Sequence, residues 1–504
     1  MLDKVQHFIV LMLENRSFDH MLGYLEAADS RIDGLNGDET NPVDPRLPDG
    51  TRVQVSPDAR YTGDFDRTVN GKVVDVGPGH EFTDAFEQLY APNAGPVTGA
   101  VPNQGFVANY GRQANSSAAM APRIMKCFAP EALPVLTTLA REFALCDAWF
   151  SSVPGPTWPN RLFVHAATSD GLVVHKKKLY GMRTLYDLLK AKDLSARIYA
   201  GDIAQSLLLK RLLFSGIFRM MDAFYADARS GKLPTYSFIE PDYFGGNATD
   251  QHPPHDIAAG ENLIANVYEA LRASRYWNTS ALIVLYDEHG GLYDHVTPGE
   301  AVNPDGKNSG DPAFDFQRLG LRVPAVVASP YIPRGTVDHT TYDHTSIIRT
   351  VRTRFGLADA LTRRDSVGPT LDGLFTLATP RDDAPLKLPR PKRSAALRKP
   401  ARPAPLSDLQ RQLLDLADMV AAVHARARIA PIRKAAAPMK LADEESARRY
   451  VSAVYAEQTA VSDALHGEEP APAPRPTRPR RKKTAKKKAA KKKAARKKAT
   501  RKKR

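Results

Sequence analysis

Residues Ala281–His295 read ALIVLYDEHGGLYDH, and this stretch decides the fold. Its first six residues are apolar or favour strands, and a glycine pair lies shortly after them. A short apolar run bounded in this way predicts a buried strand. In an open parallel α/β sheet, functional groups collect just beyond the carboxyl ends of the strands. The polar residues after this strand are Asp287, Glu288, His289, Asp294 and His295, so we expect a metal or phosphate site there.

The same arrangement of an apolar run followed by polar residues recurs along the chain. His7–Leu13 leads directly into ENRSFDH at 14–20, and further buried strands are predicted at Ala196–Ala200, Tyr236–Ile239 and Val323–Ser329. Between them, apolar residues at helical spacing predict helices at Glu81–Tyr90, Pro130–Phe143, Asn160–Thr168, Ile257–Ser274 and Ile347–Phe355. Strands that alternate with helices predict one α/β catalytic domain over residues 1–379, with a mostly parallel central sheet. Asp29–Arg67 is rich in Gly, Pro, Asp and Asn and is predicted to form surface loops.

Composition changes after this domain. Residues 380–405 are dense in proline and basic residues and are predicted to be a linker. Residues 406–466 are predicted to be helical, with one amphipathic helix at Ser407–His424 and another at Glu444–Leu465. Ser407 and Gln410 form a capping-box pattern at the start of the first helix. We expect the two helices to form a hairpin docked on the catalytic domain, and the Lys/Ala-rich residues 467–504 to be a disordered basic tail.

Charge is concentrated in that tail. The chain of 504 residues carries a formal charge of +15, but residues 471–504 hold 19 lysines and arginines and no acid, so the remainder carries −4. Two cysteines exclude a disulfide framework. The N-terminus is a poor signal peptide, and no apolar run approaches the roughly 20 residues that span a bilayer. These features predict a cytoplasmic protein without a transmembrane segment, with the nucleoid or a membrane surface as locations that the tail could add.

Three groups of oxygen-bearing side chains follow strands or a rigid turn: Glu14 and Asn15, Thr157, and Asp287 with Glu288. An oxygen-only set favours a hard divalent cation, Ca²⁺, Mg²⁺ or Mn²⁺, or Zn²⁺ in an oxygen-rich site. A metal beside Thr157 would favour its alkoxide and polarise a phosphoryl oxygen. Each group alone has a simpler explanation, since such residues often cap helices or lie in solvated turns. Their joint occurrence with clustered histidines at predicted strand ends favours the catalytic interpretation.

Six motifs resemble a known family. They are ENRSFDHMLG at 14–23, PGH at 78–80, PTWPNRLFVH at 156–165, HPPHD at 252–256, DEHGGLYDHV at 287–296 and YDHTSIIRT at 342–350. Over about residues 3–375 they resemble the phosphoesterase family of non-specific phospholipases C and related acid phosphatases, most of all the plant-type non-specific phospholipases C. The resemblance implies an alkaline-phosphatase-like α/β fold, a three-layer sandwich.

The resemblance also implies residue roles. Thr157 would be the nucleophile and would complete a metal site. The histidines around the phosphate would be His80, His252, His344 and, less directly, His289. The metal ligands would be Glu14, Asn15, Thr157, Asp287 and Glu288. Asp294 and His295 would hold their loop in place, His255 would support the site or be purely structural, and Asn160 and Arg161 match the motif without an assigned role.

The implied reaction is hydrolysis of a phospholipid phosphodiester, such as phosphatidylcholine, to diacylglycerol and a phospho-head group through a phospho-threonine intermediate. An alternative is an acid phosphatase that acts on phosphomonoesters. Trp158, Tyr243 and Phe244 could line a lipid cleft in the first case, but aromatic residues near loops are more often part of ordinary packing.

The basic tail departs from the family and resembles the tails of linker-histone-like proteins. Its lysines and arginines would neutralise phosphates through counterion release, without reading sequence. DNA, polyphosphate or an anionic membrane surface are the partners that such a charge run predicts. This leaves a hypothesis of another class, a DNA- or polyanion-binding protein whose catalytic domain is secondary.

Overall fold

The structure is a computed structural model that describes all residues except 48, 70–71, 92–102, 393–405, 428–442 and 467–504. Met1–Glu468 forms one compact unit. The tail from residue 467 and half of the predicted linker, residues 393–405, lie outside the described residues. Where the structure describes the chain, no helix is both long and apolar enough to cross a membrane.

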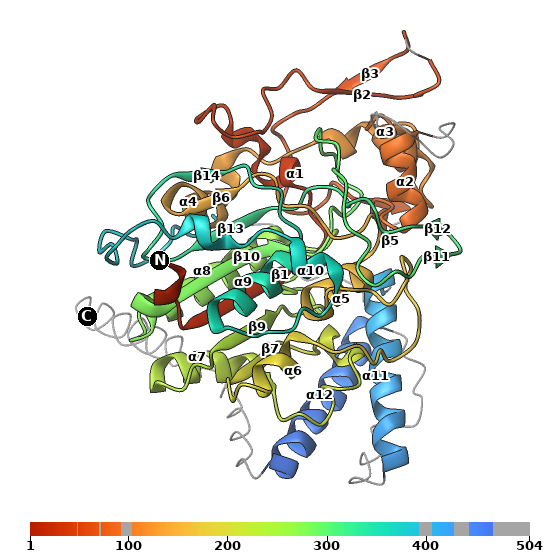
Figure 1. Ribbon diagram of the computed structural model, residues 1–504. Helices are drawn as coiled ribbons and strands as arrows, with labels where there is room; N and C mark the ends of the chain where they lie inside the picture. The colour runs from red at the N-terminus through yellow and green to blue at the C-terminus, as the bar shows by residue number, and fades with distance from the viewer. Residues whose placement is uncertain (48, 70–71, 92–102, 393–405, 428–442, 467–504) are drawn as a thin grey trace, which may run out of the picture. The chain divides into compact units, whose positions relative to one another are not determined.

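A mostly parallel sheet of eight strands forms the centre of this unit, in the order β14-β6-β13-β10-β1-β9-β7-β8 (Figure 1). The strands are β1 (His7–Leu13), β6 (Ala144–Cys146), β7 (Ala196–Ala200), β8 (Phe218–Met220), β9 (Tyr236–Glu240), β10 (Ser280–Tyr286), β13 (Ala325–Ala328) and β14 (Thr336–Asp338). β1 runs parallel to both β10 and β9, whereas β13 runs antiparallel to β10 and β6. Every residue of β10 is buried, as expected for a central strand covered on both faces.

Helices cover both faces of the sheet, so the predicted α/β sandwich is confirmed (Figure 1). The helices of the catalytic part are α1 (Phe18–Leu22), α2 (Phe82–Tyr90), α3 (Phe106–Arg112), α4 (Pro134–Glu142), α5 (Thr157–Ala166), α6 (Leu185–Lys190), α7 (Met221–Ser230), α8 (Ile257–Arg272), α9 (Thr345–Phe355) and α10 (Arg363–Val367). In one group, α8 packs against both α4 and α7. In a second group, α5 packs against α6 and α9, and α9 packs against α10.

Three small hairpins lie outside the central sheet. They are β2 (Thr40–Pro42) with β3 (Arg52–Gln54), β4 (Asp66–Val69) with β5 (Lys72–Asp75), and β11 (Ser309–Gly310) with β12 (Ala313–Phe314). The first of them, together with the start of β4, corrects the prediction that Asp29–Arg67 forms surface loops. The strands of the first hairpin are especially short. They have three residues each, too few to produce a recognisable alternation of polar and apolar side chains.

The two C-terminal helices are α11 (Asp408–Ala427) and α12 (Glu444–His466), and they pack against each other as predicted. The predicted capping box is present: the Ser407 hydroxyl accepts from the Gln410 N–H at 3.1 Å, and the Ser407 N–H donates to Gln410 Oε1 at 3.1 Å. Arg219, in β8, pairs with Asp463 of α12 at 2.7 Å, so the hairpin docks on the edge of the sheet.

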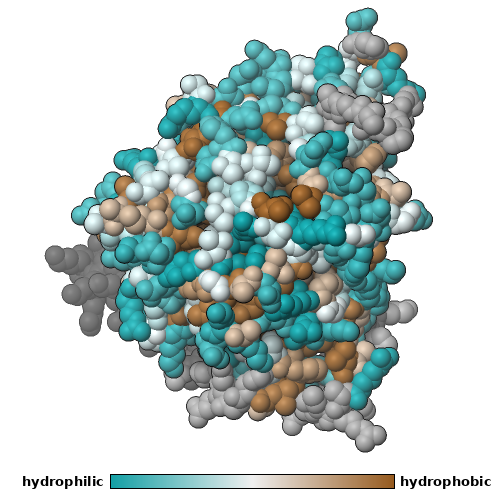
Figure 2. Space-filling model, viewed as in Figure 1, coloured by the Kyte–Doolittle hydropathy of each residue, from teal (hydrophilic) through white to brown (hydrophobic). Residues whose placement is uncertain are grey.

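Large exposed apolar side chains are few among the described residues: Met1, Val43, Leu47, Val302, Val367, Leu386 and Leu465. Figure 2 shows apolar side chains scattered in small groups over a mostly polar face. The apolar residues of the chain are therefore largely used in the core.

Candidate active site

Thr157 is the first residue of α5, which corrects the prediction that it precedes a helix beginning at Asn160. Pro159 falls within the first turn of this helix. Proline is tolerated in the first helical turn, because N–H groups there have no partner within the helix. Asn160 holds the preceding turn: its Nδ2 donates to the carbonyls of Val153 and Gly155 at 3.1 Å each, and its Oδ1 accepts from the Val153 N–H at 3.1 Å. Asn160 thus has a positioning role that its motif did not reveal.

The Thr157 hydroxyl faces the end of β1. Its Oγ1 lies 3.2 Å from Glu14 Oε2 and 3.3 Å from Asn15 Oδ1, and all three side chains are buried. Asn15 has a φ of 52°, a left-handed conformation that is uncommon outside glycine. Its N–H donates to Asp287 Oδ1 at 3.0 Å. The structure therefore brings Thr157, Glu14, Asn15 and Asp287 together.

The two glycines after β10 allow the motif segments to approach each other closely. A Cβ on Gly290, which has a φ of +68°, would lie 2.2 Å from the carbonyl oxygen of Asn15. A Cβ on Gly291 would lie 2.2 Å from the carbonyl oxygen of Gly79, next to His80. Only glycine fits at both positions without displacing a neighbouring backbone.

Glu288 and His80 lie beside this group. Glu288 Oε2 accepts from the Gly290 N–H at 2.6 Å, whereas its buried Oε1 has no hydrogen-bond partner among the described residues. Burial raises the pKa of Glu288 to about 8, and His80 opposes this shift. His80 Nε2 is 3.4 Å from Asn15 Nδ2. Burial lowers the pKa of His80, but the negative charges of Glu288 and Glu81 outweigh it and raise the pKa overall.

The remaining predicted histidines differ in how their ring nitrogens are used. The His252 ring lies 5.6 Å from that of His80, and its buried Nε2 has no hydrogen-bond partner in the described part of the chain. His289 Nε2 is bonded to Gln88 Oε1 at 2.7 Å. His344 accepts from Trp149 at 3.3 Å and donates from Nε2 to the Asp287 carbonyl at 2.7 Å. His344 therefore supports Asp287, and contact with a phosphate would require one of these bonds to open.

Two further predicted residues, His255 and His295, each pair with an aspartate. His255 Nδ1 lies 2.7 Å from Asp250 Oδ1, and His295 Nδ1 lies 2.7 Å from Asp19 Oδ2. The supporting roles expected for them stay predictions.

Arg161 is a residue of the site whose role the sequence did not reveal. Its buried guanidinium lies 2.6 Å from Glu14 Oε1, 3.4 Å from Asp287 Oδ2 and 3.6 Å from Glu240 Oε2. It stands four residues after Thr157 on α5, and this spacing places both on one face of the helix. That spacing was the signal available in the sequence.

A second set of buried residues links Glu14 to the C-terminal hairpin. Gln205 Nε2 donates to Glu14 Oε1 at 2.6 Å, and the Gln205 N–H donates to Glu240 Oε2 at 2.7 Å. Tyr243 donates its hydroxyl to Glu240 Oε2 at 3.0 Å, and its carbonyl accepts from Gln410 of α11 at 3.0 Å. No local sequence pattern predicts these contacts, because they join distant segments.

Trp158, Tyr243 and Phe244 are almost fully buried in the main core, so packing explains them and they do not line an open lipid cleft.

These residues fit a divalent cation. Glu14, Asn15, Thr157, Asp287 and Glu288 offer only oxygen ligands, as Ca²⁺, Mg²⁺ or Mn²⁺ prefers. Burial also raises the pKa of Glu14 well above its usual value. A cation would offset the cost of burying these carboxylates together and would give the unpartnered Glu288 Oε1 a partner.

The chain matches known proteins over most of its length. The model of the phosphoesterase family matches residues 5–358. Non-specific phospholipase C6 of Arabidopsis thaliana is 40% identical over 448 residues, which cover 83% of this chain and 81% of the relative. Phospholipase C B of Mycobacterium tuberculosis is 27% identical and covers 78% of this chain and 82% of its own length.

Among solved structures, a protein in the alkaline phosphatase superfamily from Vibrio parahaemolyticus aligns with 47% of this chain and 64% of its own, at 14% identity and a TM-score of 0.31. The match to the family model and the 40% identity confirm the resemblance found in the motifs. The chain belongs to the phosphoesterase family and is a phosphoric ester hydrolase.

Proposed function

We propose that this enzyme hydrolyses the phosphodiester of a phospholipid as a phospholipase C, with Thr157 as nucleophile in a site that uses a divalent cation. The observation that carries the proposal is the convergence of the Thr157 hydroxyl on Glu14 and Asn15, 3.2 and 3.3 Å away, with Asp287 bonded to Asn15. Two relatives, 40% and 39% identical to this chain, are named non-specific phospholipases C.

The chain's own residues account for binding and orientation. Thr157 lies at the N-terminus of α5, where free backbone N–H groups favour an anion. Arg161 holds Glu14 and Asp287 through ion pairs at 2.6 and 3.4 Å. A divalent cation, when bound, would favour the deprotonated hydroxyl and polarise a phosphoryl oxygen.

The proposed reaction has two displacements at phosphorus. Thr157 Oγ1 forms a bond to phosphorus, the bond from phosphorus to the glycerol oxygen breaks, and diacylglycerol leaves with a proton. Thr157 then carries the phospho-head group. Water attacks the same phosphorus, gives up a proton, and Thr157 leaves with its hydroxyl restored.

Proton transfer is assigned to His80 and His252. His252 Nε2 has no hydrogen-bond partner among the described residues, and the centroids of the two rings lie 5.6 Å apart. His289 and His344 are less suited, because hydrogen bonds to Gln88 and to the Asp287 carbonyl engage their Nε2 atoms.

An aromatic group near the nucleophile turn favours a lipid over a small monoester. A Cβ on Gly155 would lie 3.1 Å from the Cα atom of Phe82. The centroid of the Phe82 ring lies 5.4 Å from that of Phe86 and 5.2 Å from that of Phe314. Phe86 and Phe314 are half-buried, so this group extends from the turn before Thr157 to the surface. Such apolar surface suits the glycerol and acyl chains of a phospholipid.

The test compares wild-type enzyme with Thr157→Ala and Thr157→Ser. Each is assayed on phosphatidylcholine, p-nitrophenyl phosphorylcholine and p-nitrophenyl phosphate. We expect Thr157→Ala to lose turnover with its thermal unfolding unchanged, and Thr157→Ser to retain part of it because a hydroxyl remains. Acid-quenched wild-type enzyme should carry a phosphocholine group on the peptide that contains Thr157. Wild-type-like turnover by Thr157→Ala would refute the nucleophile, and turnover of the monoester alone would favour the phosphatase alternative.

Residues 471–504, which lie outside the described residues, support a second activity. Their 19 lysines and arginines without a single acid provide the charge for binding DNA, polyphosphate or an anionic membrane. We propose that this segment directs the enzyme to a polyanion and takes no part in the hydrolysis.

A further inference from the structure

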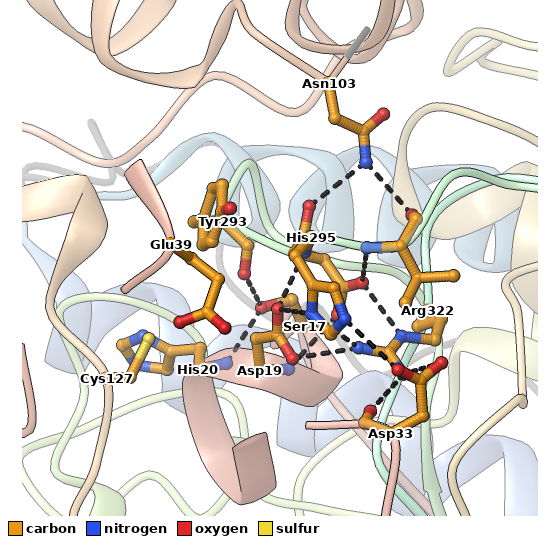
Figure 3. A network of polar contacts seen from close by, with 12 residues as sticks. Ser17, Asp19, His20, Asp33, Glu39, Asn103, Cys127, Tyr293, His295 and Arg322 are labelled. Atoms are coloured by element: carbon orange, nitrogen blue, oxygen red, sulfur yellow. Dashed lines mark hydrogen bonds and ion pairs between the residues drawn. The ribbon is translucent and has the colours of Figure 1, made fainter. Parts of the chain in front are cut away.

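Arg322 lies fully buried at the meeting point of two motif segments. Its Nε donates to Asp294 Oδ1 at 2.9 Å, and its Nη2 donates to Asp19 Oδ1 at 2.8 Å. Its Nη1 donates to the carbonyls of Asp33 and Asp147 at 2.7 and 2.8 Å. Figure 3 shows Arg322 directed at Asp19 and His295, with Ser17 and Tyr293 behind them. Every edge of this guanidinium is therefore engaged, in the fork geometry that only arginine provides.

The two aspartates belong to the segments that carry the candidate metal ligands. Asp19 is in α1, shortly after Glu14 and Asn15, and Asp294 follows Asp287 and Glu288 in the loop after β10. Direct bonds join the same segments: the Asp19 N–H donates to Asp294 Oδ2 at 3.1 Å.

Two more contacts close the connection. The Ser17 hydroxyl donates to the Tyr293 carbonyl at 2.6 Å, and the His295 N–H donates to Asp19 Oδ2 at 2.7 Å. The two segments that carry the candidate ligands are thus bonded to each other at residues that follow the ligands in sequence, and Arg322 binds both segments there.

We propose that Arg322 is a positioning residue for the candidate metal site, holding the segment after Asn15 against the segment after Glu288. This inference rests on the proposed metal site. Nearer the ligands, the segments meet through the Asn15 N–H on Asp287 and the close approach of Gly290 to Asn15. Without Arg322, this end of the two segments keeps only the direct hydrogen bonds, and the carboxylates of Asp19 and Asp294 lose their shared counterion, so we expect the ligand pairs to separate more readily.

The carboxylates of Asp19 and Asp294, with His295, also lie close enough together to suggest a cation site of their own. The contacts argue against that interpretation. Arg322 already supplies a fixed positive charge to both carboxylates. Burial lowers the pKa of His295, but its bonds to Asp19 and Asp33 raise it overall, to about 10, so His295 is a second positive charge. The acidic groups have their counterions within the protein.

The full-length protein tests the proposal as Arg322→Lys, which keeps the charge but loses the fork, and as Asp294→Asn, which is close in size. Amide hydrogen exchange is measured without metal, and binding of Mn²⁺, Ca²⁺ and Zn²⁺ is measured by calorimetry. The amides of Asn15 and Gly290 should exchange about tenfold faster or more in both variants, while those of α4 stay at wild-type rates. Substitution of residues that orient metal ligands without touching the metal typically lowers metal affinity about 10- to 100-fold, and we expect both variants to lose affinity by this amount.

Arg352→Lys is the matched control. It removes a guanidinium from a pair with Asp365, at 2.9 Å, that touches neither segment. Its Asn15 and Gly290 amides should exchange as in wild type, and its metal affinity should be unchanged.

Three results would overturn the proposal. One is wild-type exchange at Asn15 and Gly290 in both variants, and another is equal acceleration in α4, which would show a global loss of stability. The third is a second ion bound by wild type and lost in Asp294→Asn, which would make the cluster a cation site. If wild type binds none of the three ions, the metal proposal fails, and the exchange rates still decide the role of Arg322.

Discussion

Arg161→Met removes the positive charge from the centre of the candidate active site. Arg161 is 2% exposed, and its partners Glu14, Asp287 and Glu240 are 0–1% exposed. Methionine fills much of the same volume but leaves three buried carboxylates without their counterion. Breaking a buried pair by removing one partner costs about 3–5 kcal/mol of unfolding free energy. We expect a loss of this size near neutral pH, together with loss of hydrolysis, since Glu14 loses its 2.6 Å contact.

The loss should depend on pH in a defined direction. Burial raises the pKa of Glu14 well above its usual value, and Arg161 is the main influence that lowers it. Removing Arg161 raises the folded-state pKa further, so the folded variant binds more protons than the unfolded chain. Stability then falls as pH rises above the unfolded pKa of about 4.5 and continues to fall up to the folded pKa. Wild type loses stability in the same way until its own Glu14 ionises in the folded state, whereas the variant continues to lose it. The deficit relative to wild type should therefore be constant at low pH and grow as pH rises above the folded-state pKa of Glu14 in wild type.

Urea unfolding of both proteins at several pH values measures this deficit. Arg31→Met is the control, because Arg31 pairs with Asp29 at 2.6 Å on the surface, with side chains 60% and 34% exposed. Exposed pairs contribute about 0–1 kcal/mol. A deficit in Arg161→Met no larger than in this control, or one that does not change with pH, would refute the role assigned to Arg161.

Three other predictions follow from single features. Glu261 is buried and accepts from the first N–H groups of α4 at 2.7 and 3.1 Å, and burial raises its pKa to about 8. The stability that protonated Glu261 contributes is complete below about pH 4.5 and is lost as pH rises through 8. In Glu261→Gln, the free energy of unfolding measured with urea should therefore fall less between pH 4.5 and 8 than in wild type. An equal fall in both proteins would contradict this prediction. Gly290→Ala should abolish hydrolysis, because the added Cβ would meet the Asn15 carbonyl and displace it. The left-handed backbone conformation of Gly290 would add about 1–2 kcal/mol of strain. Gly299→Ala is the control and should hydrolyse substrate normally, because the space around Gly299 is open. Deleting 471–504 should remove salt-sensitive retention on DNA and leave hydrolysis of a soluble substrate unchanged; retention by the truncated protein would place the polyanion site elsewhere.

Much of the fold could be predicted because its central strands are continuous apolar runs. β1, β7, β9, β10 and β13 coincide with predicted strands to within about two residues at each end. The short strands β6, β8 and β14 were missed, because three residues are too few to show a periodicity. The antiparallel direction of β13 was also beyond prediction, since residue pattern indicates burial and says nothing of strand direction.

The candidate site was predicted unevenly for a similar reason. Glu14, Asn15 and Asp287 follow buried strands, so their convergence with Thr157 could be inferred from the topology of a parallel sheet. The hydrogen bonds that the histidines make could not be inferred, because they depend on partners distant in sequence, such as Gln88 and Trp149.

The sequence by itself determined that two apolar strands end in acidic motifs, and that a hydroxyl on a proline-flanked turn accompanies them. Those properties are local, since hydrophobic runs and turn residues act over a few positions. Only the tertiary structure decided that Thr157 begins a helix, that Arg161 balances three buried carboxylates, and that Arg322 ties Asp19 to Asp294. Burial without compensation is too costly for charged groups, so their partners must be found wherever the folded chain places them.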